Sequence, residues 1–420
     1  METRNEELET ASIELYQYMC NALVGSEKIV RYRRLFFKLF DETWNTQRGF
    51  ELISSGSKSE GLDLHGSDFD LMTLQKLFKV YENIDSSGFV ITIDTNNAQP
   101  GFALLEVPEN IGKCCPVLFP KTDNGYLLSS RKMRDLLTVK SRLYNGAFSI
   151  HGPSVCHNEV DLDRVYCLQC NTWPFAAKAW LLRNKSIEWP PQEVMENITE
   201  QGVLLVPVGS KSSSNEVNDL EWRMSFSLSE KVLIHSFNYV QLMCYALLKI
   251  YLKEIVNSKK TLSKLLCSYY MKTLLFWILE ETDGSKWTPE NLIHCFLACV
   301  KRLCYWITIN YIPNYFIPTH NMIDAHYELG NIHQADRHMR MLQNTVQNTE
   351  SGNPHLSVNA NTYLMRALSF SNDLAGFQLT SKRVLQMMKK SDEYKAFLKD
   401  VLTVNDSLAP LARMIQNLDR

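Results

Sequence analysis

The sequence lacks long apolar runs, because its most apolar segments carry Lys, Asn or His every few residues. A membrane-spanning helix needs about 20 consecutive apolar residues, so no membrane span is expected. The first residues, METRNEELETAS, also lack the basic start and apolar stretch of a secretory signal. The 11 cysteines fall at irregular spacings that suggest no disulfide framework. Together these absences predict a reduced, cytoplasmic protein with free thiols.

A strong net charge is missing too, since 44 Lys and Arg oppose 46 Asp and Glu and leave a formal charge of −2. Without a global positive field, the basic clusters at 131–134, 140–142 and 259–264 are expected to be solvated surface rather than a nucleic-acid groove. Cys167 and Cys170 have a zinc-like spacing, but no matching pair lies at a finger-like distance. We therefore expect them to form a core pair near the end of a strand.

The order of apolar patterns predicts an α+β fold in two lobes, which suits a chain of 420 residues. Helical spacing covers residues 6–24 and 27–45. Short β-rich segments follow at 50–54, 69–74, 89–94, 102–107 and 159–168. From Trp173 onward the pattern is helical, with long apolar helices expected over 232–254, 262–279 and 292–309 and a more polar one over 322–346. Residues 347–362 read as a polar link.

The segment 54–72, SSGSKSEGLDLHGSDFDLM, sets a Gly-Ser turn ahead of the acidic pair Asp68 and Asp70. Residues i and i+2 of a strand share one face, so the two carboxylates can converge. Close carboxylates repel unless a cation lies between them, and Mg²⁺ combines one or two protein carboxylates with phosphate oxygens. The turn, Ser55 to Ser57, offers N–H groups and hydroxyls to a polyphosphate. The segment predicts a metal-dependent phosphoryl or nucleotidyl transfer site, the alternative being a solvated turn.

A third acid is available in the alternating segment EVDLDRVYCL at 159–168. Asp163 would present its carboxylate from a strand, and Asp161, two residues earlier, shares its face and is the rival candidate. Three carboxylates can hold two metal ions that brace an in-line displacement. The alternative is that Asp163 is a surface residue on an edge strand.

Four blocks in order resemble the cyclic GMP-AMP synthase-like receptors of the male-abnormal-twenty-one (Mab) family of nucleotidyltransferase-fold proteins. The blocks are GSKSEGLDLHGSDFDLM at 56–72, DLDRVYCLQCNTWPFAAKAWLLRNKSIEWP at 161–190, WRMSFSLSEKVLI at 222–234 and LLCSYYMKTLLFWILEE at 265–281. The resemblance spans residues 6–320. It implies a bilobal nucleotidyltransferase fold, with a mixed β-sheet core, N-terminal helices and an all-helical C-terminal lobe.

The implied domains are N-terminal helices packing on both lobes (1–48), a nucleotidyltransferase core (49–205), a Mab-type helical lobe (206–330) and a C-terminal extension (331–420). The implied function is a ligand-activated, metal-dependent synthase that joins ATP and GTP into a cyclic dinucleotide in innate immune signalling. The alternative is a non-catalytic nucleotide- or protein-binding scaffold with the same fold. The intact set of acids favours the enzyme.

The resemblance implies that Asp68, Asp70 and Asp163 are the catalytic metal ligands. The residues expected to bind nucleotide are Ser55, Gly56, Ser57, Arg223, Ser225, Ser227, Glu230, Lys249, Ser268, Tyr269 and Lys272. Lys249 lies in a nearly all-apolar helix, where a buried charge needs an anionic partner such as a phosphate. Tyr269 is the candidate for base stacking and Tyr270 its rival. Ser225 and Ser227 could instead be helix-start caps.

The implied cofactor is Mg²⁺, with Mn²⁺ as an alternative. The vertebrate DNA sensor of the family carries a zinc-binding His-Cys-Cys-Cys insertion and a basic N-terminal extension. Here Cys244 is the single cysteine or histidine in residues 236–248, and the N-terminus is acidic. We therefore expect no structural zinc, and double-stranded RNA or another ligand rather than DNA as the activator. The expected assembly is a monomer or a ligand-induced oligomer.

Overall fold

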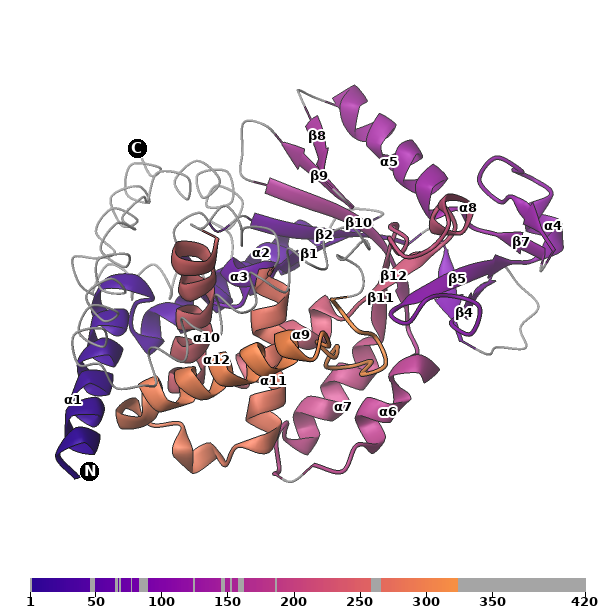
Figure 1. Cartoon of the computed structure of the whole chain (residues 1–420). Coiled ribbons are helices and arrows are strands. Elements are labelled where there is room, and N and C mark those ends of the chain that lie inside the picture. Colours follow the sequence, from indigo (N-terminus) through magenta and orange to yellow (C-terminus); the bar gives the residue numbers. More distant parts are fainter. Residues whose placement is uncertain are drawn as a thin grey trace, which may run out of the picture.

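Figure 1 shows a computed structural model in which one mixed β-sheet and a group of packed helices lie side by side. The structure describes residues 2–45, 50–64, 67, 69–76, 78–82, 90–123, 125–144, 148–151, 153–157, 162–185, 187–257 and 266–323. Asp68, Asp161 and the segments expected at 347–362 and 331–420 lie outside these residues. So does nearly all of the helix expected over 322–346.

Some of the described helices precede the strands, several lie between them and the last ones follow them. They are α1 (Glu2–Tyr18), α2 (Glu27–Asn45), α3 (Gly56–Ser59), α4 (Glu109–Gly112), α5 (Ser130–Tyr144), α6 (Lys178–Leu182), α7 (Gln192–Gln201), α8 (Asn215–Asn218), α9 (Ser227–His235), α10 (Tyr239–Ile250), α11 (Ser268–Glu281) and α12 (Leu292–Thr308). A π-helical turn, Met19–Leu23, extends α1. None of these helices is long and apolar enough to cross a bilayer.

The described strands belong to one sheet with both parallel and antiparallel pairs. They are β1 (Phe50–Ser55), β2 (Phe69–Gln75), β3 (Lys79–Tyr81), β4 (Val90–Asp94), β5 (Phe102–Val107), β6 (Lys121–Thr122), β7 (Gly125–Leu127), β8 (Phe148–His151), β9 (Ser154–His157), β10 (Leu162–Cys170), β11 (Val203–Val206) and β12 (Trp222–Ser225). Their main order is β1-β2-β10-β11-β12-β5-β4-β3. β2 runs parallel to β10 and antiparallel to β1.

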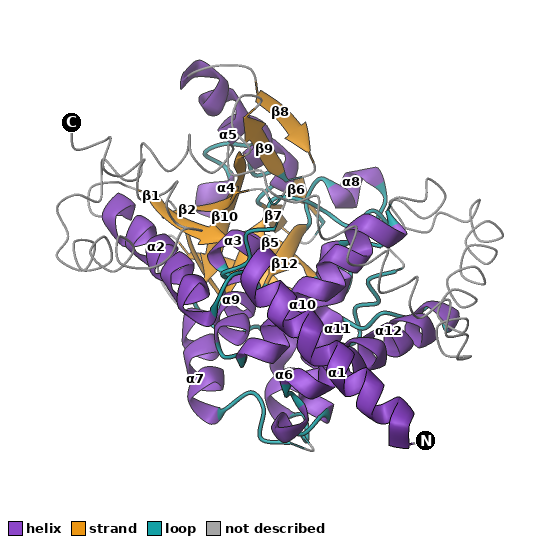
Figure 2. Ribbon diagram, turned by 90° about the vertical axis from the view of Figure 1, so that its left-hand side faces the viewer, coloured by secondary structure: helices purple, strands orange, loops and turns teal. Residues whose placement is uncertain are grey.

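The two predicted N-terminal helices are confirmed, and they end and begin around Gly25, which has a φ of +96°. A Cβ at Gly25 would lie 2.9 Å from Ile29, so both the backbone and the space favour glycine. Helix α2 packs along β1 and β2, as Figure 2 shows. The Phe37 and Phe40 rings lie 5.4 and 5.5 Å from the Phe69 ring of β2. Aromatic packing thus fixes α2 beside the strand that carries Asp70.

The expectation of an all-helical chain after Trp173 is wrong, because β11 and β12 continue the sheet. All four residues of β11 are buried, so the strand is a short apolar run without alternation. Such a run cannot be told from part of a buried helix by its periodicity. The predicted core pair is confirmed, since Cys167 and Cys170 are both buried in β10.

The continuous helix expected over 232–254 is two helices, α9 and α10. Asn238 accepts a hydrogen bond from the Gln241 backbone, and the Gln241 side chain accepts one from the Asn238 backbone. This capping box starts a new helix at Tyr239. Helix α11 begins at Ser268 rather than at 262, because Cys267 has an extended backbone. The helix expected over 292–309 is confirmed as α12.

Candidate functional site

The Gly-Ser turn lies directly against Asp70. In the antiparallel pair of β1 and β2, Ser55 is the register partner of Asp70. Gly56 follows with a φ of +71°, a conformation that L side chains rarely adopt. A Cβ at Gly56 would overlap the Asp70 carboxylate. Glycine is therefore required for two reasons, and the Asp70 carboxylate lies over the turn that the sequence predicts to contact phosphate.

Strand register places Asp163 opposite Asp70. β2 and β10 are parallel neighbours, and Asp163 is the partner of Asp70 in their register. Paired residues of adjacent strands point to the same face, and adjacent strands lie about 4.8 Å apart. The structure thus brings two of the three predicted acids together. Among the described residues, no cluster of three metal-ligating side chains occurs, and the third predicted acid, Asp68, lies outside them.

A buried network fixes the strand end just before the turn. Ser54 is fully buried, and its backbone N–H and hydroxyl both donate to the Asp41 carboxylate of α2, at 2.8 and 2.9 Å. Lys231 of α9 donates to the Ser54 carbonyl at 3.0 Å and lies 3.4 Å from Asp41. Burial raises the pKa of the Asp41 carboxyl, and Lys231 opposes that shift. Sequence reasoning missed both residues, because neither belongs to a recognisable motif.

The turn that follows α3 is held through its backbone. The Glu60 carbonyl accepts from Arg34 of α2 at 2.9 Å, and Gly61 accepts from Arg33 at 3.3 Å. The Ser59 carbonyl lies 3.0 Å from Nε2 of His235, at the end of α9. Burial, followed by the nearby Arg34 charge, lowers the pKa of His235 to about 4. A neutral His235 therefore donates to Ser59 at physiological pH.

Two lysines from the helical part reach the same loop. Lys249 of α10 donates to the Ser57 hydroxyl. Lys272 of α11 donates to Glu60 at 2.6 Å and to Glu230 at 3.0 Å. Burial alone would lower the pKa of Lys272, but Glu230 and Glu60 raise it well above its usual value. Lys272 and Glu230, both predicted to bind nucleotide, are thus paired with each other in this structure.

The remaining predicted nucleotide residues lie on β12, α9 and α11. Arg223 is exposed on β12, and Ser225 ends that strand. Ser227 is the first residue of α9, and its buried hydroxyl makes no hydrogen bond. Neither serine is a side-chain cap, because α9 is preceded by Phe226 without a capping bond. Ser268 is exposed at the start of α11.

Of the two adjacent tyrosines, Tyr269 keeps solvent-accessible surface. Its hydroxyl accepts from Asn314 at 3.2 Å, and burial together with Glu230 raises the pKa of its phenol. Tyr270 is buried, and its hydroxyl donates to the Met322 carbonyl at 2.9 Å. A ring enclosed in this way cannot stack on a base, so Tyr269 is the better candidate.

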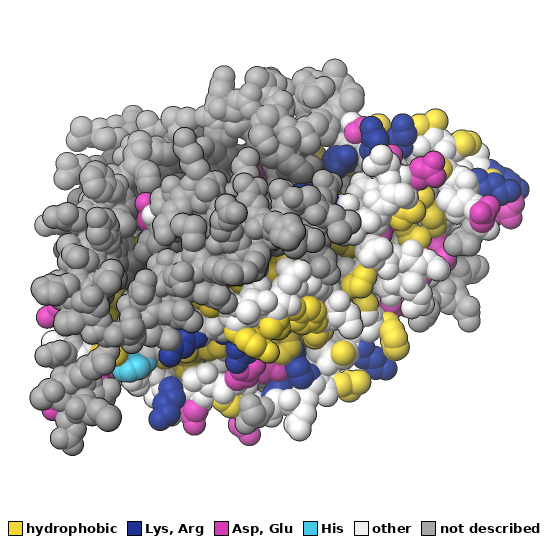
Figure 3. All heavy atoms as spheres, viewed as in Figure 1, with side chains coloured by type: hydrophobic (Ala, Val, Ile, Leu, Met, Phe, Trp, Pro, Cys, Tyr) yellow, Lys and Arg dark blue, Asp and Glu magenta, His cyan; other side chains and the backbone are white. Residues whose placement is uncertain are grey.

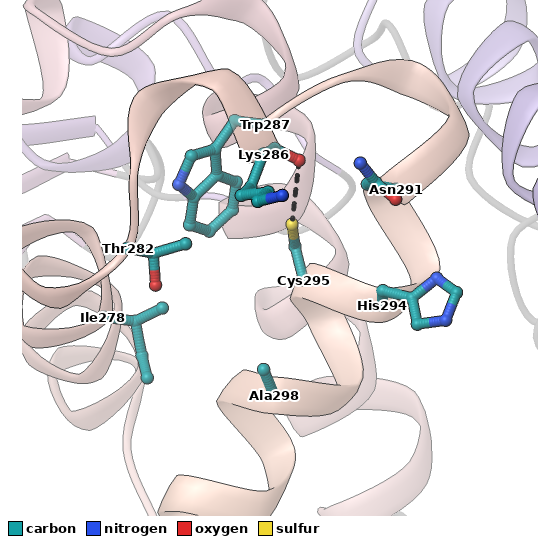
Figure 4. A pocket seen from close by; sticks show the side chains of 8 residues that line it. All are labelled: Ile278, Thr282, Lys286, Trp287, Asn291, His294, Cys295 and Ala298. Atoms are coloured by element: carbon teal, nitrogen blue, oxygen red, sulfur yellow. Dashed lines mark hydrogen bonds between the residues drawn. The ribbon is translucent and has the colours of Figure 1, made fainter.

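A cavity of about 380 Å³ lies elsewhere, between α11 and α12. Figure 4 shows that it is lined by side chains from the end of α11, the connecting segment and the start of α12, including Trp287, Lys286 and His294. None of the predicted site residues lines it. The paired acids, the Gly-Ser turn and the two lysines therefore define the candidate site.

Two family models match consecutive parts of the chain. Residues 137–236 match the Mab-21 protein nucleotidyltransferase domain. Residues 241–343 match the Mab-21 protein HhH/H2TH-like domain. The chain thus carries the Mab-21 nucleotidyltransferase and HhH/H2TH-like domains in order.

Curated relatives are similar over part of the chain. Cyclic GMP-AMP synthase of Mus musculus is 27% identical over 179 residues, which cover 39% of this chain and 34% of the relative. A cyclic GMP-AMP synthase-like receptor of Ctenocephalides felis is 28% identical over 149 residues, covering 34% and 33%. Protein mab-21-like 3 of Danio rerio is 26% identical over 185 residues, covering 42% of each. The chain thus spans about a third of the length of the two cyclic GMP-AMP synthase relatives that it matches.

Proposed function

We propose that this protein is a metal-dependent nucleotidyltransferase that joins ATP and GTP into a cyclic dinucleotide when an activating ligand is bound. The observation that carries the proposal is the register of β1, β2 and β10, which sets Ser55, Asp70 and Asp163 side by side. A purely structural strand has little reason to align two carboxylates, because like charges at this spacing repel.

The residues present fit a divalent cation. Carboxylate oxygens are the ligands that Mg²⁺ prefers, and Asp70 and Asp163 supply them from adjacent strands. Gly56 leaves the space that the Asp70 carboxylate occupies. Asp70 and Asp163 would hold the ion together with Asp68, and the Mn²⁺ ion would suit the same oxygens. When bound, the metal would supply charge neutralisation for phosphoryl transfer and activation of the attacking hydroxyl.

The side chains around the acids would bind and orient the nucleotides. Ser55 and Ser57 hydroxyls would contact the donor triphosphate, and Lys249, already at Ser57, would neutralise its charge. Arg223 offers a planar fork to a phosphate or base edge. Tyr269 would stack on a base. These residues act by positioning and electrostatics, so no covalent intermediate with the protein is needed.

The relatives named cyclic GMP-AMP synthase and cyclic GMP-AMP synthase-like receptor support the choice of substrates and product. Because of the similarity to these relatives, we also propose a bilobal arrangement with a nucleotide cleft, a role in innate immune signalling and a cytoplasmic location. For the activator we propose double-stranded RNA or another ligand rather than DNA. On the described part of the face in Figure 3, small groups of basic and acidic side chains lie scattered among hydrophobic and neutral ones.

The test is an assay of purified protein with labelled ATP and GTP, Mg²⁺ or Mn²⁺, and a panel of double-stranded RNA and DNA. We expect a cyclic product in the presence of one ligand. Asp70→Asn should abolish it. Asp219→Asn is the matched control, because Asp219 pairs with Arg131 away from the site. No product across the panel would favour a non-catalytic scaffold. Undiminished product in Asp70→Asn would overturn the catalytic role proposed for the acids.

A further inference from the structure

Lysines of helices α10 and α11 contact both ends of the loop between β1 and the turn at Gly61. Lys249 of α10 contacts Ser57, near the start of the loop. Lys272 of α11 contacts Glu60, the residue that follows α3. Both lysines were expected to bind nucleotide. Their different partners in the structure separate their roles.

Lys272 is enclosed with two acids. The exposed fractions of the Lys272, Glu60 and Glu230 side chains are 11%, 2% and 8%. Among the described residues, Lys272 is the single ion-pair partner of Glu60. The Lys272 Nζ and Glu60 Oε1 atoms lie 2.6 Å apart. Because a buried carboxylate is costly without a cation, we expect Lys272 to stay paired with Glu60. Drawing Lys272 away toward a triphosphate would leave two buried carboxylates without a cation.

The backbone around Glu60 is fixed independently. Its carbonyl accepts from Arg34 of α2, and the preceding Ser59 carbonyl faces His235 of α9. The end of the loop is thereby tied to three helices, two through the backbone and α11 through the Glu60 side chain. Of these ties the Glu60 side chain makes the ion pair, and it joins the loop to the helix that also carries Tyr269.

We propose that Glu60 is a positioning residue for the donor-phosphate loop. Its ion pair with Lys272 fixes the end of Gly56–Ser59, so that Ser57 is already placed for a triphosphate before one binds. The same pair occupies Lys272 and leaves Lys249 as the lysine that meets the phosphates. A preset loop loses less conformational freedom when ligand binds, and this raises affinity. The proposal rests on the proposed nucleotidyltransferase function.

The test compares Glu60→Gln, which keeps the shape and removes the charge, with Glu60→Asp, which keeps the charge on a shorter side chain. Hydrogen exchange reports the loop, and calorimetric titration with a non-hydrolysable ATP analogue and Mn²⁺ reports affinity. In Glu60→Gln we expect the amides of 56–62 to exchange about tenfold faster and the Kd to rise about tenfold, as for a lost charge-assisted hydrogen bond. Glu60→Asp should fall between this variant and the wild type.

The matched control is Glu281→Gln, because Glu281 pairs with Arg302 at an exposed position of α11 and α12, away from the loop. It should change neither measurement. Exchange that accelerates in α12 as much as in the loop would mean general destabilisation and would overturn the proposal. So would a Glu60→Gln variant within twofold of the wild type in both measurements. If the wild type binds no nucleotide, the proposed function itself fails, whatever the exchange data show.

Discussion

The acids around the Gly-Ser loop form two groups that differ in their partners. We call Asp70 and Asp163 the front acids, and Asp41, Glu60 and Glu230 the rear acids. In front, Asp70 and Asp163 are set opposite each other by strand register. Behind, Asp41 lies 3.4 Å from Lys231, and Glu60 shares Lys272 with Glu230. The rear acids hold Lys231 of α9 at the end of β1 and Lys272 of α11 at the turn after α3. The difference indicates that the rear carboxylates hold the loop in place, whereas the front carboxylates are the ones that we propose bind the metal ion.

Removing a front acid should have the largest effect, and on turnover alone. We expect Asp163→Asn to reduce cyclic product formation on the order of 1,000-fold, because a metal ligand is lost. The free energy of unfolding should stay equal or rise, since repulsion between the two carboxylates is relieved. Product assays and urea unfolding measure the two quantities. A loss of unfolding free energy as large as that of Lys272→Met would contradict the distinction between the front and rear acids.

Removing the rear lysine should act on stability first. Lys272→Met leaves Glu60 and Glu230 buried without their cation, which we expect to cost about 3–5 kcal/mol in the free energy of unfolding. Arg302→Met, which breaks an exposed pair with Glu281, should cost less than about 1 kcal/mol. Urea unfolding of both variants checks the prediction. Equal losses would show that Lys272 is no more structural than a surface residue.

The rear pairing is the part of the site that the sequence could not reveal. Lys272 and Glu60 are 212 positions apart, and no periodicity links residues on a loop and a distant helix. Asp163 could be predicted, because alternation in 159–168 indicates a strand whatever its neighbours are. Its register with Asp70 depends on strand pairing, which single-strand patterns do not specify.

The secondary structure likewise has elements that the sequence could predict and elements that it could not. The N-terminal helices were predictable because apolar residues recur at helical spacing over both segments and Gly25 separates them. β11 was missed because all its residues are buried, and tertiary contacts rather than alternation decide its structure. The break at Asn238 did have a sequence signal, the capping pair with Gln241, but the surrounding apolar run outweighed it.

Gly56 lies against the Asp70 carboxylate, so replacing it should disturb the front acids. Gly56→Ala must place a Cβ at the Asp70 carboxylate and adopt a positive φ. We expect a stability loss of about 1–2 kcal/mol from the backbone alone, together with a marked loss of turnover. Gly125→Ala is the control, because it shares the positive φ but has no atom within 4 Å of the added Cβ. Equal turnover in both variants would contradict the role of this space.

The contact of His235 with the Ser59 carbonyl should make stability depend on pH without affecting the acids that are proposed to bind metal. The folded pKa of His235 is about 4, below the unfolded value near 6.5, so protons bind preferentially to the unfolded chain. Its contribution is complete above pH 6.5 and declines as pH falls toward 4, by about 2 kcal/mol for this partly exposed ring. His235→Gln should flatten unfolding free energy across that window. A decline of unchanged size in the variant would assign it to other groups.

The most direct test of the front acids is Mn²⁺ binding measured by electron paramagnetic resonance, in the presence of ATP. The wild type should bind the ion. Asp163→Asn should weaken binding by at least about tenfold, as expected for loss of a charged ligand, and Asp219→Asn should bind like the wild type. Equal Mn²⁺ affinity in the wild type and Asp163→Asn would contradict the assignment of Asp70 and Asp163 as a shared metal site.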